Sequence, residues 1–191
     1  MVGKDFDRYV ISNATPKYLK YGIWLAEPRF SAPFEKTKII IRQTSDIIRA
    51  TIDENNYYNL NNVYNLEPKN NQYDLKYLLG ILNSKLMVYV YQGIVQERKR
   101  LFAEIKKVNL DQIPIRKIDF QNPEEKEMYN RIISLVDQML SAKKQLLVTK
   151  TESDKNYLNR KCEQLDKEID QLVYQLYGLT EDEIKIVEGK N

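Results

Sequence analysis

The chain has 191 residues, 42% of them hydrophobic, and 30 Lys+Arg against 27 Asp+Glu give it a formal net charge of +3. This length suits one domain, or a small domain with an appended helical element, and the mixed charge argues against general disorder. Histidine is absent and Cys162 is the single cysteine, which excludes Ser-His and Cys-His catalysis, histidine-based zinc sites and an internal disulfide.

The charge is unevenly distributed along the chain. Residues 1–120 hold 19 Lys+Arg against 13 Asp+Glu, a net +6, whereas residues 121–191 hold 11 against 14, a net −3. The first part is therefore the one expected to face a polyanion. The low cysteine content is typical of a reducing cytosol, so we expect a cytoplasmic location. The longest apolar run, residues 77–91, contains polar residues and is too short to span a bilayer, so we expect no membrane partner.

Short strand-like runs separated by turn residues occupy much of residues 1–120. The segment KIIIR at 38–42 is β-branched, apolar and bounded by charge, which predicts a central strand. Further strands are expected at 21–26, 47–52, 57–60, 63–66 and 112–118, with turns at 53–56 and 61–62. Pro114 indicates that the last of these strands lies at a sheet edge.

One helix is expected within this part of the chain. Asp74 is a suitable N-cap for a helix that runs to about Tyr91, with leucines at helical spacing. Asn83 and Ser84 interrupt its apolar sequence. We interpret them as structural residues that hydrogen-bond adjacent backbone and hold the helix against the sheet.

The pattern after Pro123 is purely helical. A helix is predicted over 124–147, and Thr151 with Asp154 indicates a capping box for a second helix. The second helix alternates apolar spacings of four and three, so the two should pair as an antiparallel hairpin with Cys162 buried. Gly178 is a suitable C-terminal cap, and a last short helix should follow Thr180. The expected fold class is α+β, with a mixed domain over residues 1–120 and a helical hairpin over 121–191.

Basic and amide side chains form three candidate groups for nucleic-acid contact. Arg98, Lys99, Arg100, Lys106 and Lys107 form the densest basic region, which suits phosphate contacts, although an exposed helix face or linker has the same composition.

Arg42 and Gln43 leave the end of the predicted central strand, and Arg and Gln side chains read guanine and adenine edges. Arg49 is a further candidate near the same strand end. The alternative is an ordinary strand terminus. Asn55 and Asn56 are candidate base contacts too, but asparagine is also a common turn residue.

No catalytic or metal-binding motif stands out. Glycine-rich phosphate loops are absent, and paired carboxylates occur only at turns and on helix faces. A metal-dependent nuclease is an alternative, using an acid such as Asp53 with one of three Glu-x-Lys triplets, at Glu67/Lys69, Glu104/Lys106 or Glu183/Lys185. We interpret these residues as solvated charges and expect no catalytic residue and no metal site.

Five segments, in this order, resemble the TaqI-like C-terminal specificity domain of restriction-modification DNA adenine methyltransferases. They are GKDFDRY at 3–9, KIIIR at 38–42, LLGILNSKL at 78–86, VNLDQIPI at 108–115 and IDQLVYQLYGLTEDEI at 169–184. The resemblance implies a duplex-DNA recognition module of a type II or IIG adenine-N6 methyltransferase, which flips an adenine and uses S-adenosylmethionine. Base-reading residues vary within the family, so none is transferred from it.

The catalytic Asn-Pro-Pro-(Tyr/Phe) motif and the glycine-rich cofactor motif of such enzymes are absent from this chain. We therefore expect a recognition module that is not itself an enzyme, with S-adenosylmethionine in a separate catalytic part and with duplex DNA and a methyltransferase domain or subunit as partners. A separate specificity subunit, or a protein-interaction module whose helical hairpin docks a partner, is the alternative. The candidate DNA-binding residues are Arg42, Gln43, Arg49, Asn55, Asn56, Arg98, Lys99, Arg100, Lys106 and Lys107.

Overall fold

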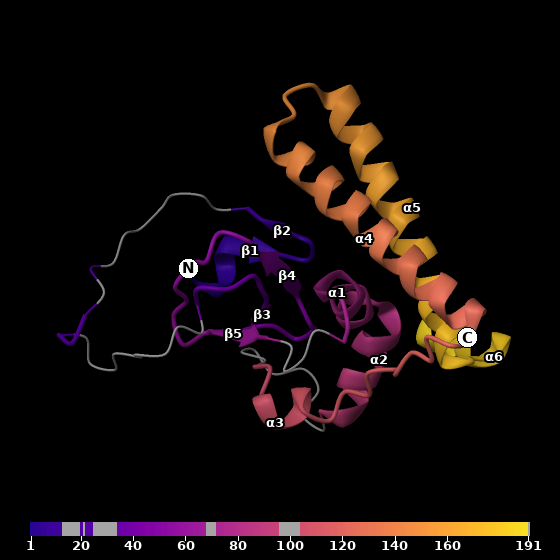
Figure 1. Ribbon diagram of the computed structural model, residues 1–191. Coiled ribbons are helices and arrows are strands. Elements are labelled where there is room, and N and C mark those ends of the chain that lie inside the picture. The colour runs from indigo at the N-terminus through magenta and orange to yellow at the C-terminus, as the bar shows by residue number, and fades with distance from the viewer. Residues whose placement is uncertain (13–19, 21, 25–33, 68–71, 96–103, 191) are drawn as a thin grey trace.

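The computed structural model describes residues 1–12, 20, 22–24, 34–67, 72–95 and 104–190. Within these residues two small antiparallel sheets pack beside a pair of short helices, and a long helical hairpin extends from them (Figure 1). This arrangement confirms the α+β class. No helix in the described part of the chain is both long and apolar enough to cross a membrane.

The central strand is β3, Lys38–Arg42, as predicted. It lies between β4, Ala50–Asp53, and β5, Val63–Leu66, and pairs with both in antiparallel register. Successive isoleucines alternate faces: Ile39 and Ile41 join the main core, whereas Ile40 packs with Phe6 on the other face. A strand covered on both faces needs apolar residues at every position, and this explains the continuous isoleucine run.

A second, two-stranded sheet is formed by β1, Phe6–Asp7, and β2, Val10–Ile11, after a 3-10 turn, η1, Gly3–Asp5. Its turn residue Tyr9 has a positive φ of 63° and is buried, and its N–H donates to the Ala50 carbonyl at 3.0 Å. The β1–β2 hairpin is thereby fastened to the start of β4.

Three strand predictions differ from the structure. Residues 57–60, predicted as a strand, form a loop in which the Tyr57 N–H donates to the Asp53 carboxylate at 2.8 Å. The strand predicted over 47–52 begins only at Ala50. The strand predicted over 112–118 is wrong, since no ladder forms there. A fourth strand, predicted over 21–26, is not formed at residues 22–24, which make a bend and a turn, and its other residues lie outside the described part of the chain.

The helix predicted from Asp74 is divided into α1, Leu75–Asn83, and α2, Lys85–Ile94. Ser84 has extended backbone angles, and its hydroxyl accepts from the Met87 N–H to cap α2. The Asn83 amide donates to the Ala50 carbonyl at 3.0 Å and accepts from the Ala50 N–H at 3.1 Å. Both side chains are buried, so the structural interpretation of this pair is confirmed.

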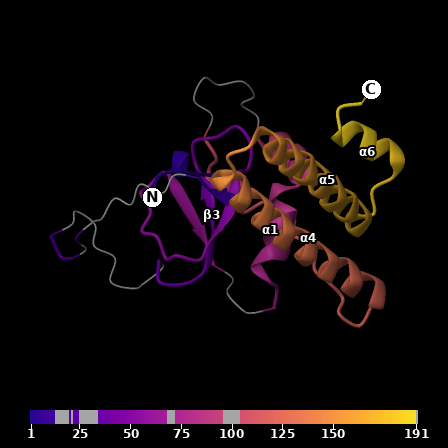
Figure 2. The same ribbon diagram turned by 90° about the horizontal axis from the view of Figure 1, so that it is seen from above.

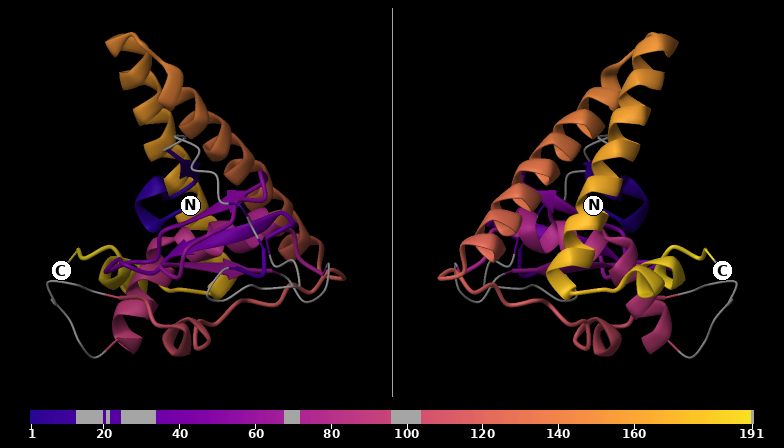
Figure 3. Two further views of the ribbon diagram at one scale, coloured as in Figure 1. Left: turned by 90° about the vertical axis from the view of Figure 1, so that its left-hand side faces the viewer. Right: turned by 90° about the vertical axis from the view of Figure 1, so that its right-hand side faces the viewer.

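The helical hairpin consists of α4, Pro123–Val148, and α5, Glu152–Tyr177, followed by α6, Glu181–Val187. Thr151 and Thr180 cap the two later helices, and Gly178 ends α5 with a φ of 69°, as predicted. Cys162 is buried. Figure 2 shows α4 and α5 side by side. A short helix, α3, Lys107–Leu110, lies on the opposite side of the molecule from the α4–α5 connection (Figure 3).

The apolar core is continuous across residue 120. Ile132, Val136 and Met139 of α4 are fully buried in the same cluster as Tyr77 and Ile81 of α1. The contact is close because α1 has Gly80 at the crossing, where a Cβ atom would lie 2.8 Å from Cγ2 of Ile132. The boundary between residues 120 and 121 coincides with the turn before α4, and the division into two domains stays a prediction.

Candidate DNA interface

The antiparallel register of the sheet separates two of the candidate groups. At one end of β3, Arg42 pairs with Val63, and Gln43 follows it. At the other end, Lys38 pairs with Asp53, and the turn carrying Asn55 and Asn56 begins there. Gln43 and the asparagine turn therefore lie at opposite ends of the three-stranded sheet.

The end of β3 meets the segment that precedes α3. Thr44 forms an isolated antiparallel bridge with Glu104, and the Ile105 N–H donates to the Gln43 carbonyl at 2.7 Å. The Gln43 N–H in turn donates to the Asn62 carbonyl at 3.0 Å. These backbone contacts bring residues 104–107 to the strand end, although about sixty residues separate them in the chain.

We use the name strand-end surface for Gln43, Thr44, Asp46, Lys106 and Lys107. Thr44, Asp46, Lys106 and Lys107 are exposed, and Gln43 is partly exposed. The Lys107 ammonium pairs with Asp111 at 2.5 Å on the surface of α3, a contact that solvent screens. The surface combines a planar amide, a hydroxyl, one carboxylate and two ammonium groups. The amide and hydroxyl suit hydrogen bonding to base edges, and the two ammonium groups suit contacts to phosphates.

The side chain of Arg42 is held by contacts with other residues of the fold. Its guanidinium lies 5.7 Å from the centre of the Phe6 ring and donates to the Phe6 carbonyl, and its stem packs against Gly3. These contacts fasten β3 to β1. A role for Arg42 in reading bases stays a prediction, and the side chain would have to leave this position to do so.

Arg49 is held by a carboxylate. Its Nη1 donates to both oxygens of Asp7, at 3.0 and 3.1 Å, and its Nε donates to the Ser45 hydroxyl at 3.3 Å. Partial burial opposes ionisation of Asp7, but the Arg8 N–H and the Arg49 guanidinium outweigh it, so the pKa of Asp7 is lowered. Arg49 thus closes the 43–49 loop and anchors it to the β1–β2 hairpin.

The asparagine turn has a clear structural role. The Asn55 N–H donates to Asp53, and Asn56 has a φ of 57°, in the left-handed region that asparagine tolerates. Asp53 also pairs with Lys38 at 2.6 Å, and both side chains are fully buried. The interpretation of Asp53 as a solvated charge is wrong, because its carboxylate is buried and binds Lys38 and the N–H groups of the turn. The described residues contain no cluster suited to a metal ion. Arg98, Lys99 and Arg100 lie outside the described residues.

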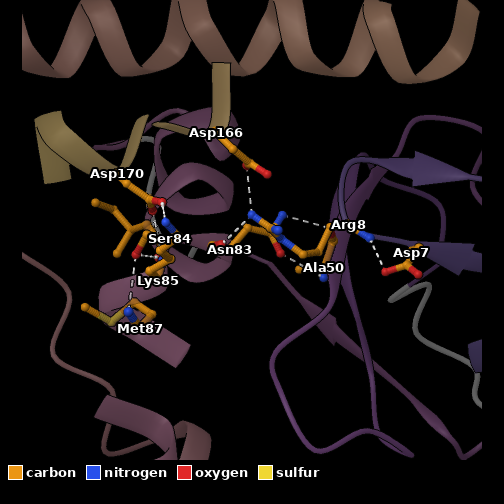
Figure 4. Close-up of polar contacts among 10 residues, drawn as sticks. Asp7, Arg8, Ala50, Asn83, Ser84, Lys85, Met87, Asp166 and Asp170 are labelled. Atoms are coloured by element: carbon orange, nitrogen blue, oxygen red, sulfur yellow. Dashed lines mark hydrogen bonds and ion pairs between the residues drawn. The ribbon is translucent and has the colours of Figure 1, made fainter. Parts of the chain in front are cut away.

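A network around Arg8 was not among the sequence predictions (Figure 4). Arg8 Nη2 donates to the Asn83 carbonyl at 2.8 Å and to the Asp166 carboxylate at 2.8 Å. Asp170, one helical turn further along α5, accepts from the Lys85 N–H at 2.9 Å. The one sequence feature that could have indicated a role for Arg8 is its place in the GKDFDRY motif, between Phe6 and Tyr9. Its partners could not be predicted, because they lie 75 and 158 residues away in the chain.

The match to a known family covers the strands and short helices that build this site. The TaqI-like C-terminal specificity domain matches residues 1–115. The chain belongs to this family. No curated protein matches the chain.

Because the chain belongs to this family, its specificity domain is a DNA target-recognition module of restriction-modification enzymes. All ten candidate DNA-binding residues of the specificity domain lie within the matched range. The hairpin α4–α5 and helix α6 follow it, although they share its core. The Asn83-Ser84 pair therefore belongs to the framework of the specificity domain, and the strand-end surface belongs to its exposed loops.

Proposed function

We propose that this chain reads duplex DNA for a type II or IIG adenine-N6 methyltransferase whose catalytic domain, with S-adenosylmethionine, lies on another segment or subunit. The pairing of Gln43 and Thr44 with residues 104–105 carries this proposal. This contact brings Gln43 close to Lys106 and Lys107, which supports base reading beside phosphate contacts in a member of a DNA-recognition family. The absence of an Asn-Pro-Pro-(Tyr/Phe) motif from the chain supports separate catalysis, and the single cysteine supports a cytoplasmic enzyme.

The test begins with selection of a binding sequence from a random duplex pool by the full chain. Affinity for the selected duplex is then measured by fluorescence anisotropy over a series of salt concentrations. Replacement of Lys106 and Lys107 by Ala should weaken binding to all sequences and lower the magnitude of the salt slope by roughly 1 to 2. Failure of the folded chain to enrich any duplex would contradict the proposal.

A matched pair of lysines serves as the control. Lys126 and Lys150 are exposed on the helical hairpin, and their replacement by Ala removes the same charge. The salt slope should then stay close to that of the wild type. An equal effect of the two double variants would remove Lys106 and Lys107 from the interface.

Gln43 tests sequence reading separately from phosphate contact. A bidentate amide contact to adenine is worth about 1–3 kcal/mol of discrimination. Gln43→Ala should therefore relax the preference at one base pair of the selected sequence, with an unchanged salt slope. An unchanged preference at every position would exclude Gln43 as a reader.

A second role, docking of a protein partner, is supported by the free end of the helical hairpin. The α4–α5 connection lies away from α3 and the strand-end surface (Figures 1 and 3). Leu147, Val148 and Tyr157 near this end are 50%, 75% and 66% exposed. Single exposed apolar residues are ordinary, so these three favour docking only as a group at one end of the hairpin. Replacing all three by Ser should weaken binding of the accompanying methyltransferase without changing DNA affinity, as measured by calorimetry with each ligand.

A further inference from the structure

Two consecutive residues of the β1–β2 turn contact opposite parts of the molecule. Asp7 holds Arg49, the last residue of the 43–49 loop, through two hydrogen bonds. Arg8 holds Asp166 of α5 and the carbonyl of Asn83 at the end of α1 (Figure 4). The two side chains are also joined locally, because the Arg8 N–H donates to the Asp7 carboxylate at 2.7 Å.

The same turn is attached to the start of β4. The Tyr9 N–H donates to the Ala50 carbonyl, and the Asn83 amide holds both backbone groups of Ala50. The residue that follows the 43–49 loop is thus fastened to the β1–β2 turn and to α1. A guanidinium presents several donors in a fixed planar arrangement, so Arg8 can satisfy a carboxylate and a carbonyl from different elements at once.

We propose that Arg8, through Asp166, is a positioning residue that fixes the 43–49 loop relative to the helical hairpin and thereby contributes to sequence discrimination. The inference rests on the proposed function, because the loop carries Gln43 and Thr44 of the strand-end surface. Arg8 itself need not touch DNA. The side chains of Arg8 and Asp166 are 29% and 31% exposed, so the pair is partly shielded from solvent.

The fold does not depend on this pair alone. The apolar contact of α1 with α4 holds the hairpin against the sheet independently, through Gly80, Ile132 and Val136. Loss of the ion pair should therefore loosen the loop without unfolding the chain. Discrimination suffers because a reading side chain displaced by a fraction of an ångström loses its hydrogen-bond geometry.

The experiment compares Asp166→Asn with Asp137→Asn in the full chain. Asp137 of α4 pairs with Lys76 of α1 at 2.7 Å, so it also joins the hairpin to the short helices, but this ion pair does not involve the β1–β2 hairpin. Both substitutions remove one negative charge from the hairpin. The first readout is the set of backbone amide chemical shifts of residues 43–49 in the absence of DNA. The second is the affinity ratio between the selected duplex and singly mismatched duplexes.

Asp166→Asn should shift the loop amides and lower the affinity ratio about 5-fold or more, the scale of a typical coupling between sites. Asp137→Asn should leave both unchanged. Arg8→Lys should give an intermediate loss, because a single ammonium cannot serve Asp166 and Asn83 in the same geometry.

The two readouts separate failure of this inference from failure of the proposed function. Unshifted loop amides in Asp166→Asn would overturn the positioning role whether or not DNA binds. Equal changes in both Asp→Asn variants would overturn it too. If the wild-type chain enriches no duplex, the proposed function fails, and the role in discrimination fails with it.

Discussion

Asp170 connects the last helix of the hairpin to the first turn of α2. Its carboxylate accepts from the Lys85 N–H, while the Ser84 hydroxyl accepts from the Met87 N–H, so two side chains satisfy N–H groups that a helix start leaves unpaired. A carboxylate at a helix N-terminus is electrostatically favourable. Burial nevertheless raises the pKa of Asp170 to about 6, against the opposing effects of the Lys85 N–H and ammonium.

Asp170→Asn should remove a pH dependence of stability. In the unfolded chain Asp170 titrates near its ordinary value of 3.8, and in the folded chain near 6. Its stabilising contribution is therefore complete below pH 4 and is lost as the pH rises through 6. The free energy of unfolding of Asp170→Asn, relative to wild type, should rise by about 2 kcal/mol between pH 4 and pH 7.

Urea denaturation of both proteins at four pH values measures this difference. Asp46→Asn, at an exposed loop position, controls for the loss of one carboxylate. Parallel stability curves for Asp170→Asn and wild type would show that the burial of Asp170 has no cost.

Gly80 of α1 and Gly93 of α2 are helical glycines that differ in the space around them, so their replacement by Ala compares close packing with open space. A Cβ atom at Gly80 would lie 2.8 Å from Ile132 and 3.1 Å from Val136, whereas one at Gly93 would meet nothing within 4 Å. Gly80→Ala should destabilise the protein by roughly 1–2 kcal/mol, since overpacking exceeds the gain in helix propensity. Gly93→Ala should stabilise it by up to about 1 kcal/mol. Thermal unfolding of both variants tests this, and a stabilised Gly80→Ala would contradict the close packing of α1 against α4.

At the scale of elements, the segment between α3 and α4 shows how an extended chain is held without a sheet. The Tyr177 hydroxyl donates to the Pro114 carbonyl at 2.6 Å and accepts from the Arg116 N–H at 2.9 Å. The Tyr77 hydroxyl donates to the Arg116 carbonyl, and the Tyr73 hydroxyl accepts from the Ile118 N–H. Tyrosine hydroxyls thus provide the hydrogen bonds that a strand partner would have provided to the strand predicted over 112–118.

Tyr177→Phe should loosen this segment selectively. Two hydrogen bonds are lost, but their partners are exposed and can bind water, so the expected cost is only about 1 kcal/mol. Amide hydrogen exchange should become faster at Arg116 and stay unchanged at Ile39 in the central strand. Tyr157→Phe, at a 66% exposed position, is the control. Equal exchange at Arg116 in wild type and Tyr177→Phe would show that the tyrosine hydroxyl does not hold the segment.

The whole molecule depends on contacts between the strand-rich part and the helical hairpin. Four buried residues of α4, namely Ile132, Leu135, Val136 and Met139, belong to the same cluster as the buried face of α1. Arg8 and Lys85 add polar contacts to α5. The family match ends at residue 115, yet the apolar core does not.

A fragment of residues 1–120 should therefore fail to fold, because it exposes the α1 face that α4 covers. Its amide spectrum should show poor dispersion, and it should bind a hydrophobic dye. A chain ending at residue 179 keeps α4 and α5 and should fold. A well-dispersed spectrum of the 1–120 fragment would instead establish it as an independent domain.

Local patterns were sufficient for much of the fold. The isoleucine run of β3, the capping residues Thr151 and Thr180, the glycine at the end of α5 and the stripes of the hairpin act over a few residues, so the sequence alone predicts them. The ordered motifs likewise identify the family from the sequence alone. The prediction of an edge strand at 112–118 was wrong because a strand-like sequence indicates an extended chain but does not identify its hydrogen-bond partner.

The candidate site was determined by tertiary structure. The sequence by itself established the family, the central strand and the residue types that suit DNA. It did not reveal that Arg42 is engaged by Phe6 and Arg49 by Asp7, or that the register separates Asn55 and Asn56 from Gln43. The physical reason is that the donors of a side chain are free or occupied according to partners that are distant in the chain, and only the packed structure brings those partners within hydrogen-bonding distance.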